Sequence, residues 1–441
     1  MDRERKIPEG RLGRLARLAT VGVRAGSSML LSRSGTGGAK HAAEVLGTLR
    51  GLASKVGQMA GYVDGLVPEA QRAAYETSMK ALLAAAPKSS PEQIRARVEE
   101  ELGAPVDRLF ARWNDEPLAS ASIGQVHAAE LFDGRQVAVK VQHPGIARAV
   151  ESDLANAGFL ESLVGAMGGQ RLEAKKIFGV IRQRFREELD YGLEAERLSR
   201  FAALHAGDPH VRVPALVTSH SARSVLTAEL ARGATFEEAC AASPSARRAY
   251  AHTLWRFVFK GTLVGGMLNA DPHPGNYVFH PDGVVTFLDY GCVQELDERR
   301  RALARGVHLA ALARDESAFG RAVAAMVASK PGPLEDLALR YTRKCFEPLF
   351  ESPYRITRAY AASLVSGMRE MSQIALKVKD HEFFTMPSDM VFTNRLQFGF
   401  YSVLARLDVE ADYAAVERRL FDESGEARTA RPHLRAGAVE T

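Results

Sequence analysis

Three side chains with oxygen ligands stand at short, defined spacings in the second half of the chain. The segment 269–276 reads NADPHPGN, in which Asp271 and Asn276 are five residues apart, and Asp289 follows Asn276 by thirteen residues. Two carboxylates and an amide are hard oxygen ligands for Mg²⁺, and they leave coordination positions open for phosphate. A single Asp in a Pro/Gly-rich loop is usually a turn cap. Three such groups together favour a site for magnesium and phosphate.

A predicted β-hairpin joins these groups. Residues 277–279 and 284–288 have strand character and flank the Pro281-Asp282-Gly283 turn. In protein kinases the catalytic-loop Asp and Asn have the same spacing, and a further metal-binding Asp follows a short hairpin. We therefore interpret Asp289 as the main metal ligand and Asn276 as the second. Asp271 would orient or deprotonate the acceptor of a phosphoryl group.

A lysine on a predicted strand lies well upstream. Val137-Ala-Val-Lys140 belongs to the second strand of a hairpin, whose first strand is 125–131 and whose turn is Asp133-Gly134. A lysine among apolar neighbours on a buried strand needs an anionic partner. A phosphate and a helix carboxylate would supply one, although lysines on edge strands are also common.

A segment of small residues precedes this hairpin, where a phosphate-binding loop is expected. Its candidate cofactor-binding residues are Ala119, Ser120, Ala121, Ser122 and Gly124. Only the glycine would allow close backbone approach to phosphates, but serine hydroxyls and backbone amides could also hold them. A plain strand-entry loop explains the segment equally well.

Together these motifs resemble the UbiB/Coq8/ADCK (ABC1/AarF) family of atypical, protein-kinase-like ATPases. Lys55-Val-Gly-Gln58 is similar to the K-x-G-Q motif of the family, and Glu188-Leu-Asp190 to its E-x-D motif, which Tyr191-Gly-Leu-Glu194-Ala continues. The small-residue segment resembles its alanine-rich loop, and Asp-Pro-His-Pro-Gly-Asn is its usual catalytic loop. The resemblance runs from about residue 45 to residue 415.

The resemblance implies an α+β, two-lobed protein-kinase-like fold with a mainly helical C-lobe. A helical N-terminal extension carrying Lys55 and Gln58 would pack over the nucleotide site. Lys140 would contact the α- and β-phosphates and pair with Glu194, while Lys55 would pair with Glu188. Asp190 would support the same cluster. Judged without the resemblance, Lys55 is an exposed helix lysine and Glu188 part of a solvated acidic face.

Two positions depart from the patterns of the family and of protein kinases, and one segment of protein kinases is missing. Asn269 stands where family members commonly have a His that supports the catalytic loop, and Tyr290 replaces the Phe of D-F-G. No A-P-E segment follows Asp289. Instead, a helix is predicted over 296–312, shortly after this residue. We therefore expect no platform for protein substrates.

Composition and charge narrow the class of protein. The 441 residues are 46% hydrophobic and 25% charged, as in a globular protein of two or three domains, and the three cysteines are far apart. Disulfide scaffolds and cysteine zinc sites are not expected. Residues 1–50 contain ten basic and four acidic side chains. The net charge of this segment therefore exceeds the net charge of the whole chain, which is +5. This distribution argues against nucleic-acid binding by the body.

No window of the sequence has about 18 uninterrupted apolar residues, so we expect no transmembrane helix. Residues 12–31 form an amphipathic pattern with Arg14, Arg17 and Arg24, which could lie on an anionic membrane or pack on the body. The expected organisation is a basic segment and linker (1–40), a helical extension (41–110), an N-lobe with inserted helices (111–232), a C-lobe (233–422) and a disordered tail (423–441). Helices are expected over 91–103, 146–205, 250–268 and 293–415, and a short strand pair within 212–229.

The resulting functional hypothesis is a kinase or ATPase that uses ATP/ADP and Mg²⁺ and supports biosynthesis of an isoprenoid, ubiquinone-type quinone. The alternatives are a small-molecule phosphotransferase of the aminoglycoside type and a nucleotide-binding scaffold without turnover. Expected partners are the nucleotide and, as options, an anionic membrane, quinone-pathway lipids or enzymes and a second copy of the chain. No nucleic acid is expected. We expect a cytoplasmic protein, with peripheral attachment to the inner face of the membrane left open.

Overall fold

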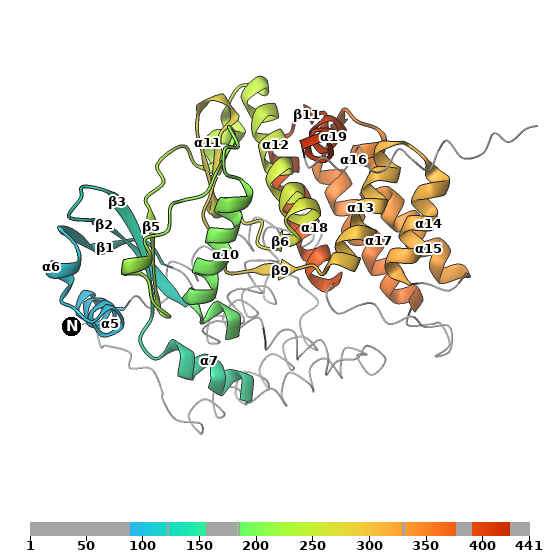
Figure 1. The fold of residues 1–441 in the computed structure, drawn as a ribbon. Coiled ribbons are helices and arrows are strands. Elements are labelled where there is room, and N and C mark those ends of the chain that lie inside the picture. The colour runs from blue at the N-terminus through green and yellow to red at the C-terminus, as the bar shows by residue number, and fades with distance from the viewer. Residues whose placement is uncertain are drawn as a thin grey trace, which may run out of the picture. The chain divides into compact units, whose positions relative to one another are not determined.

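The structure is a computed structural model that describes residues 89–120, 123–155, 183, 186–328, 331–375 and 390–423 (Figure 1). The chain divides into two compact units. The first runs to Glu194 and includes Leu216–Leu230, and the second comprises Ala195–Ala215 and the chain from Ala231 onward. The expected domain bounds, including an N-lobe over 111–232, stay a prediction. The basic segment, the K-x-G-Q extension and the tail beyond 423 lie outside the described residues.

The first unit is a four-stranded antiparallel sheet with helices. Its elements are α5 (Pro91–Leu102), α6 (Val106–Leu109), β1 (Arg112–Ser120), β2 (Gly124–Glu130), β3 (Gln136–Gln142), α7 (Ile146–Ala155), the short helix η1 (Thr218–His220), β5 (Val225–Glu229) and the start of α10 (Tyr191–Leu204). The strand order is β1-β2-β3-β5. The hairpin predicted around Asp133-Gly134 is confirmed as β2 and β3, since Gly134 supplies the positive φ of the turn.

Helix α5 confirms the helix predicted over 91–103. Ser90 and Gln93 form a reciprocal capping box at its start, Pro91 occupies the first turn, and Gly103 ends it with φ of 74°. Ile94 and Val98, one turn apart, are fully buried. The helix therefore offers one apolar stripe to the sheet.

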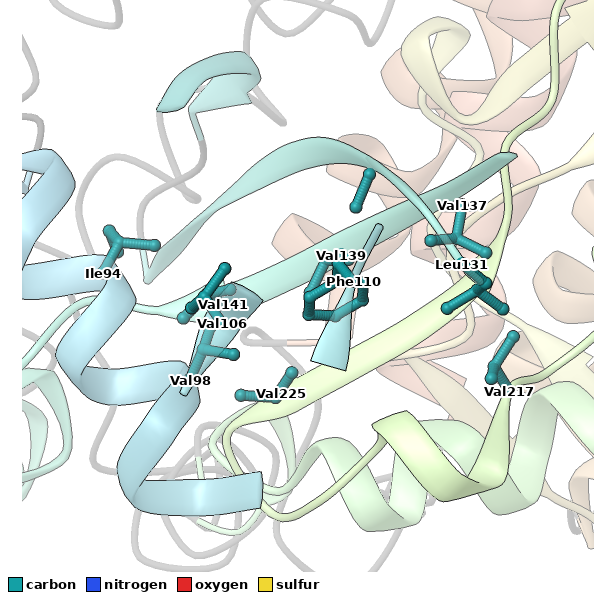
Figure 2. Packing of buried hydrophobic residues seen from close by; sticks show 11 residues of the cluster. Ile94, Val98, Val106, Phe110, Leu131, Val137, Val139, Val141, Val217 and Val225 are labelled. Atoms are coloured by element: carbon teal, nitrogen blue, oxygen red, sulfur yellow. The ribbon is translucent and has the colours of Figure 1, made fainter. Parts of the chain in front are cut away.

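The core of the first unit lies between this stripe and one face of the sheet (Figure 2). Its buried members are Ile94, Val98, Val106, Phe110, Ala129, Leu131, Val137, Val139, Val141, Val217 and Val225. The three valines of β3 alternate along the strand and are at most 1% exposed. Since successive side chains of a strand point to opposite faces, Lys140 lies on the face away from this core.

The second unit is mainly helical. Its helices are α11 (Phe236–Ala241), α12 (Pro244–Phe259), the π-helical turn η2 (Lys260–Val264), η3 (Pro274–Asn276), η4 (Pro281–Gly283), α13 (Glu298–Leu312), α14 (Glu316–Val327), α15 (Pro333–Cys345), α16 (Glu347–Phe350), α17 (Arg358–Ala375), α18 (Met390–Leu407) and α19 (Tyr413–Glu423), with the rest of α10. Its strands are β4 (Val211–Arg212), β6 (Met267–Asn269), β7 (Tyr277–Phe279), β8 (Val285–Phe287), β9 (Val293–Glu295), β10 (Tyr354–Arg355) and β11 (Glu410–Ala411). Among the described residues, none of these helices is long and apolar enough to cross a membrane.

Three expectations about the elements need correction. The strands expected within 212–229 exist as β4 and β5, but they do not pair with each other. β4 runs parallel to β8, and β5 pairs with β3. Strand structure begins at Arg112, before the first predicted strand at 125–131, because β1 is a polar edge strand without an apolar alternation. The region 293–415 is interrupted by β9, β10 and β11.

Helix α12 supports the hairpin that joins the oxygen ligands. Tyr250 donates through its hydroxyl to the His280 carbonyl at 3.0 Å, and Thr253 donates to the Gly283 carbonyl at 2.7 Å. Two residues further on, Trp255 donates to the buried carboxylate of Glu417 at 2.8 Å. The predicted β7–β8 hairpin is confirmed, with Tyr277 opposite Phe287. The hairpin is therefore held by buried side chains of α12.

Two glycine-to-alanine substitutions are expected to have opposite effects on stability. A Cβ on Gly124 would lie 2.4 Å from the Val141 carbonyl oxygen and 2.8 Å from the Tyr191 hydroxyl oxygen, whereas one on Gly306 of α13 meets nothing within 4 Å. Gly124→Ala should lower the free energy of unfolding by about 1–3 kcal/mol through overpacking. Gly306→Ala should raise it by up to about 1 kcal/mol. Denaturant unfolding checks both, and equal effects would contradict the packing at Gly124.

Candidate functional site

The loop between β6 and β7 brings two of the predicted site residues together. The side-chain amide of Asn276 donates to the Asp271 main-chain carbonyl at 3.2 Å and approaches its carboxylate oxygen at 3.4 Å. Within the loop, the Gly275 amide donates to Nδ1 of His273 at 3.0 Å. These contacts give the Pro/Gly-rich loop one compact conformation. His273 therefore takes part in the structure of the loop.

Asp289 lies just after β8, on a segment tied to the same loop. The Leu288 amide donates to the main-chain carbonyl of Asn276 at 3.0 Å. The Gly291 amide donates to Oδ1 of Asp289 at 2.8 Å, which orients the carboxylate within a tight turn. Tyr290, between Asp289 and Gly291, is fully buried, and its hydroxyl donates to the Phe287 carbonyl at 3.0 Å. The Tyr in place of Phe therefore keeps an apolar anchor and satisfies its hydroxyl.

Asn269 connects the loop to the Asp289 segment. Its Oδ1 accepts from the Asp271 amide at 3.2 Å, and its Nδ2 donates to the Asp289 main-chain carbonyl at 2.9 Å. The pairing of β6 with β9 includes Asn269, which lies opposite Val293. The Ala270 amide then donates to the Cys292 carbonyl at 2.8 Å, and the Asn269 carboxamide adds a side-chain link beside it. An Asn at this position thus provides both a donor and an acceptor between the two aspartates.

A small pocket in the second unit collects the predicted ligands. Its lining residues are Phe257, Val258, Asn269, Asp271, Pro272, Asn276, Tyr277, Phe287, Leu288 and Asp289. Burial, followed by the charge of Asp271, raises the pKa of Tyr277 above its ordinary range. Burial, followed by the charge of Asp289, likewise raises the pKa of Tyr290. Both phenols therefore stay neutral, and the negative charge of the pocket comes from the two carboxylates.

The donor set of this pocket fits Mg²⁺ with a phosphate. Among the described residues, no group of three or more His, Cys, Asp or Glu side chains could hold a metal ion on its own. Mg²⁺ is usually held by one or two carboxylates, and waters or phosphate oxygens complete its octahedron. Asp289, with the Asn276 amide oxygen, supplies such an open set.

In the first unit, Lys140 forms an ion pair with Glu194. Nζ lies 2.8 Å from one carboxylate oxygen of Glu194 and 2.9 Å from the other. Nζ also lies 5.0 Å from the centre of the Tyr191 ring. The Glu194 side chain is 4% exposed and that of Lys140 is 22% exposed, so the ammonium group keeps access to solvent. The predicted ion pair is present, and contact with phosphate stays a prediction.

The small-residue segment differs in part from a loop. Ala119 and Ser120 belong to the end of β1, where they pair with Val126 and Gln125. Ala121 and Ser122 lie outside the described residues. Gly124 opens β2 and packs tightly beside the Tyr191 hydroxyl, which explains why a glycine stands there. The segment therefore contains a strand end, and phosphate binding by its residues stays a prediction.

The E-x-D motif leads into α10. Oδ1 of Asp190 accepts from the amides of Gly192 and Leu193 at 3.0 and 3.3 Å, as a helix cap does. Glu188, two residues before Asp190, is half-buried. Lys55 and Gln58 lie outside the described residues, so the pairing of Lys55 with Glu188 stays a prediction. The place of Asp190 before a helical pattern is a sequence signal for such a cap.

Aspartate at position 269 is expected to disrupt the site, because a carboxylate cannot donate to the Asp289 carbonyl. Asn269→Asp should lower Mg²⁺-dependent turnover about tenfold, the effect of losing one buried hydrogen bond and placing a charge against a carbonyl. Asn269→His retains one donor and one acceptor and should stay closer to the wild type. Steady-state kinetics at saturating Mg²⁺ checks this order. Equal turnover in Asn269→Asp and the wild type would show that the bridge is dispensable.

Comparisons with known proteins find related chains. A family model described as ABC1 atypical kinase-like domain matches residues 81–323. Atypical kinase COQ8B, mitochondrial, of Rattus norvegicus is 32% identical over 312 residues, which cover 66% of this chain and 58% of that protein. Uncharacterized protein Rv0647c of Mycobacterium tuberculosis is 34% identical over 254 residues, covering 56% and 52%. The chain spans about half the length of these curated relatives.

A solved structure shares the fold. The chain in the complex of Rv3197 with erythromycin from Mycobacterium tuberculosis superposes with a TM-score of 0.59 at 24% identity, covering 92% of this chain and 98% of that one. With the two units described above, this similarity confirms the expected α+β, kinase-like fold for the described residues. The expected extension over the nucleotide site stays a prediction.

Proposed function

Because the chain belongs to the ABC1 atypical kinase-like family, which includes the Coq8 and ADCK proteins, we propose that it binds ATP or ADP with Mg²⁺ and catalyses ATP hydrolysis or phosphoryl transfer. The observation that carries the proposal is that Asp271, Asn276 and Asp289 line one pocket. Their side chains are the types and spacings that phosphoryl transfer uses.

Each residue has a distinct role in this proposal. Asp289 and Asn276 would hold Mg²⁺, which neutralises phosphate charge when bound. Lys140, oriented by Glu194, would contact the α- and β-phosphates. Asp271, held by the Asn276 amide, would orient the hydroxyl or water that attacks and accept its proton.

The acceptor is proposed to be a lipid or another small molecule connected with isoprenoid quinone biosynthesis. The support is the resemblance to the Coq8 branch and the short connection after Asp289. β9 begins at Val293 and α13 begins at Glu298, so the connection between Asp289 and α13 is short. A platform for extended peptides usually occupies that place in protein kinases. The basic segment of residues 1–50 would attach the chain to anionic lipid.

Turnover assays separate these possibilities. The purified chain should release phosphate from ATP only with Mg²⁺, and faster with anionic liposomes than with neutral ones. Asp271→Asn should bind nucleotide normally and lose about 10²-fold or more in turnover. Equal rates with and without liposomes would contradict membrane attachment. Efficient phosphorylation of a generic protein would contradict a small-molecule acceptor, and phosphorylation of an aminoglycoside would favour the alternative phosphotransferase.

The link with quinones is tested in the host. Deleting the gene and profiling extracted lipids should show a fall in isoprenoid quinone or the build-up of an intermediate. Re-expression of the wild-type chain, but not of Asp271→Asn, should restore the profile. An unchanged quinone profile would reject this role and leave the nucleotide chemistry standing.

A further inference from the structure

An arginine outside the predicted site residues contacts the segment that carries Asp289. Arg197 lies on α10, three residues after Glu194, and is 4% exposed. Its Nη1 donates to the Gly291 main-chain carbonyl at 3.0 Å. A buried guanidinium is costly unless its donors are used. Its use on a main-chain carbonyl beside a proposed metal ligand therefore invites a functional explanation.

Gly291 is held at both of its backbone groups. Its amide donates to Oδ1 of Asp289 at 2.8 Å, and its carbonyl accepts from Arg197 at 3.0 Å. The orientation of the Asp289 carboxylate thus depends on a glycine, the residue with the greatest backbone freedom. A charge-assisted hydrogen bond from a buried side chain restricts that freedom.

The same helix also anchors the neighbouring residue. Phe201, one turn after Arg197, packs against Tyr290 with ring centres 5.1 Å apart, and both rings are fully buried. Arg197 and Phe201 therefore hold successive residues of the Asp289-Tyr290-Gly291 turn, one by a hydrogen bond and one by packing. The aromatic contact supplies burial energy but does not fix the direction of the Gly291 peptide.

We propose that Arg197 is a positioning residue that fixes Asp289 for Mg²⁺ through Gly291. The inference rests on the proposed function and goes beyond it, because Arg197 touches neither nucleotide nor metal in this account. Without the guanidinium, the turn would sample other Gly291 conformations, and Asp289 would lose part of its preorganisation. The loss should therefore appear in the Mg²⁺ requirement more than in nucleotide affinity at saturating Mg²⁺.

The test compares three variants of the full chain. Arg197→Met keeps the aliphatic length and removes the donors, and Arg197→Lys keeps the charge with a single donor group. Arg200→Met is the matched control, because Arg200 lies on the same helix but forms an exposed ion pair with Glu295. Binding of a fluorescent ADP is measured while Mg²⁺ is titrated, and the melting temperature without ligand reports on folding.

Arg197→Met should raise the Mg²⁺ concentration for half-maximal binding about tenfold, as the loss of one charge-assisted hydrogen bond implies. Arg197→Lys should raise it by less, and Arg200→Met should match the wild type. An Arg197 variant that folds could have a lower melting temperature but the same Mg²⁺ dependence as the wild type. That result would overturn the inference and leave the proposed function standing. Absence of Mg²⁺-dependent binding in the wild type would overturn the proposed function, and the inference with it.

Discussion

Replacing Asp289 with asparagine is expected to weaken Mg²⁺-dependent nucleotide binding strongly. The substitution keeps the size of the side chain and an oxygen that can accept from the Gly291 amide, but it removes the anionic ligand. Since Mg²⁺ is bound through one or two carboxylates, losing one of them should weaken binding of the magnesium–nucleotide complex by about 10²-fold. Nucleotide-dependent thermal stabilisation in the presence of Mg²⁺ measures the effect.

Asp282→Asn is the matched control for this substitution. Asp282 lies in the β7–β8 turn with φ of 61°, a conformation that asparagine tolerates well. The Asp282→Asn substitution removes the same charge as Asp289→Asn. Asp282 lies in the same unit but does not line the pocket. The control should show wild-type stabilisation by Mg²⁺ and nucleotide. Unchanged stabilisation in Asp289→Asn would remove the kinase-like metal site from the account.

Replacing Lys140 with methionine is expected to reduce both stability and nucleotide binding. The substitution leaves the Glu194 carboxylate, 4% exposed, without its ammonium partner at 2.8 Å. Breaking a buried ion pair by removing one partner typically costs about 3–5 kcal/mol. Nucleotide affinity should also fall, because the proposed contact with the α- and β-phosphates is lost.

A double substitution separates these two effects. Adding Glu194→Gln to Lys140→Met removes the uncompensated charge, so most of the stability should return. Nucleotide affinity should stay as low as in Lys140→Met. Denaturant unfolding and nucleotide titration of both variants provide the comparison. Recovery of nucleotide binding in the double variant would mean that Lys140 has only a structural role.

The sequence predicts those parts of the site that depend on local chemistry. Asp271, Asn276 and Asp289 could be found because their residue types and spacings reflect the loop and hairpin that hold them. The Lys140–Glu194 pair was expected from the family resemblance, and alternation in β3 places Lys140 away from the valine core. α5 could be predicted because its cap residues, Ser90 and Gly103, are strong local signals.

Elements that depend on distant partners were harder to predict. β1 is an edge strand with polar residues, so its assignment depends on pairing with β2 and not on its own pattern. β4 and β5 are close in sequence but pair with strands far along the chain, β8 and β3. The contact of Arg197 with Gly291 joins residues 94 positions apart, and nothing in the local sequence signals it.

The central claim is that this chain has a nucleotide site that depends on Mg²⁺ held by Asp289 and Asn276. Isothermal titration calorimetry of the wild-type chain with ADP, once with Mg²⁺ and once with EDTA, tests it most directly. The account predicts saturable one-site binding with Mg²⁺ and a large loss of affinity with EDTA. Equal affinity in both conditions, or no binding in either, would contradict it.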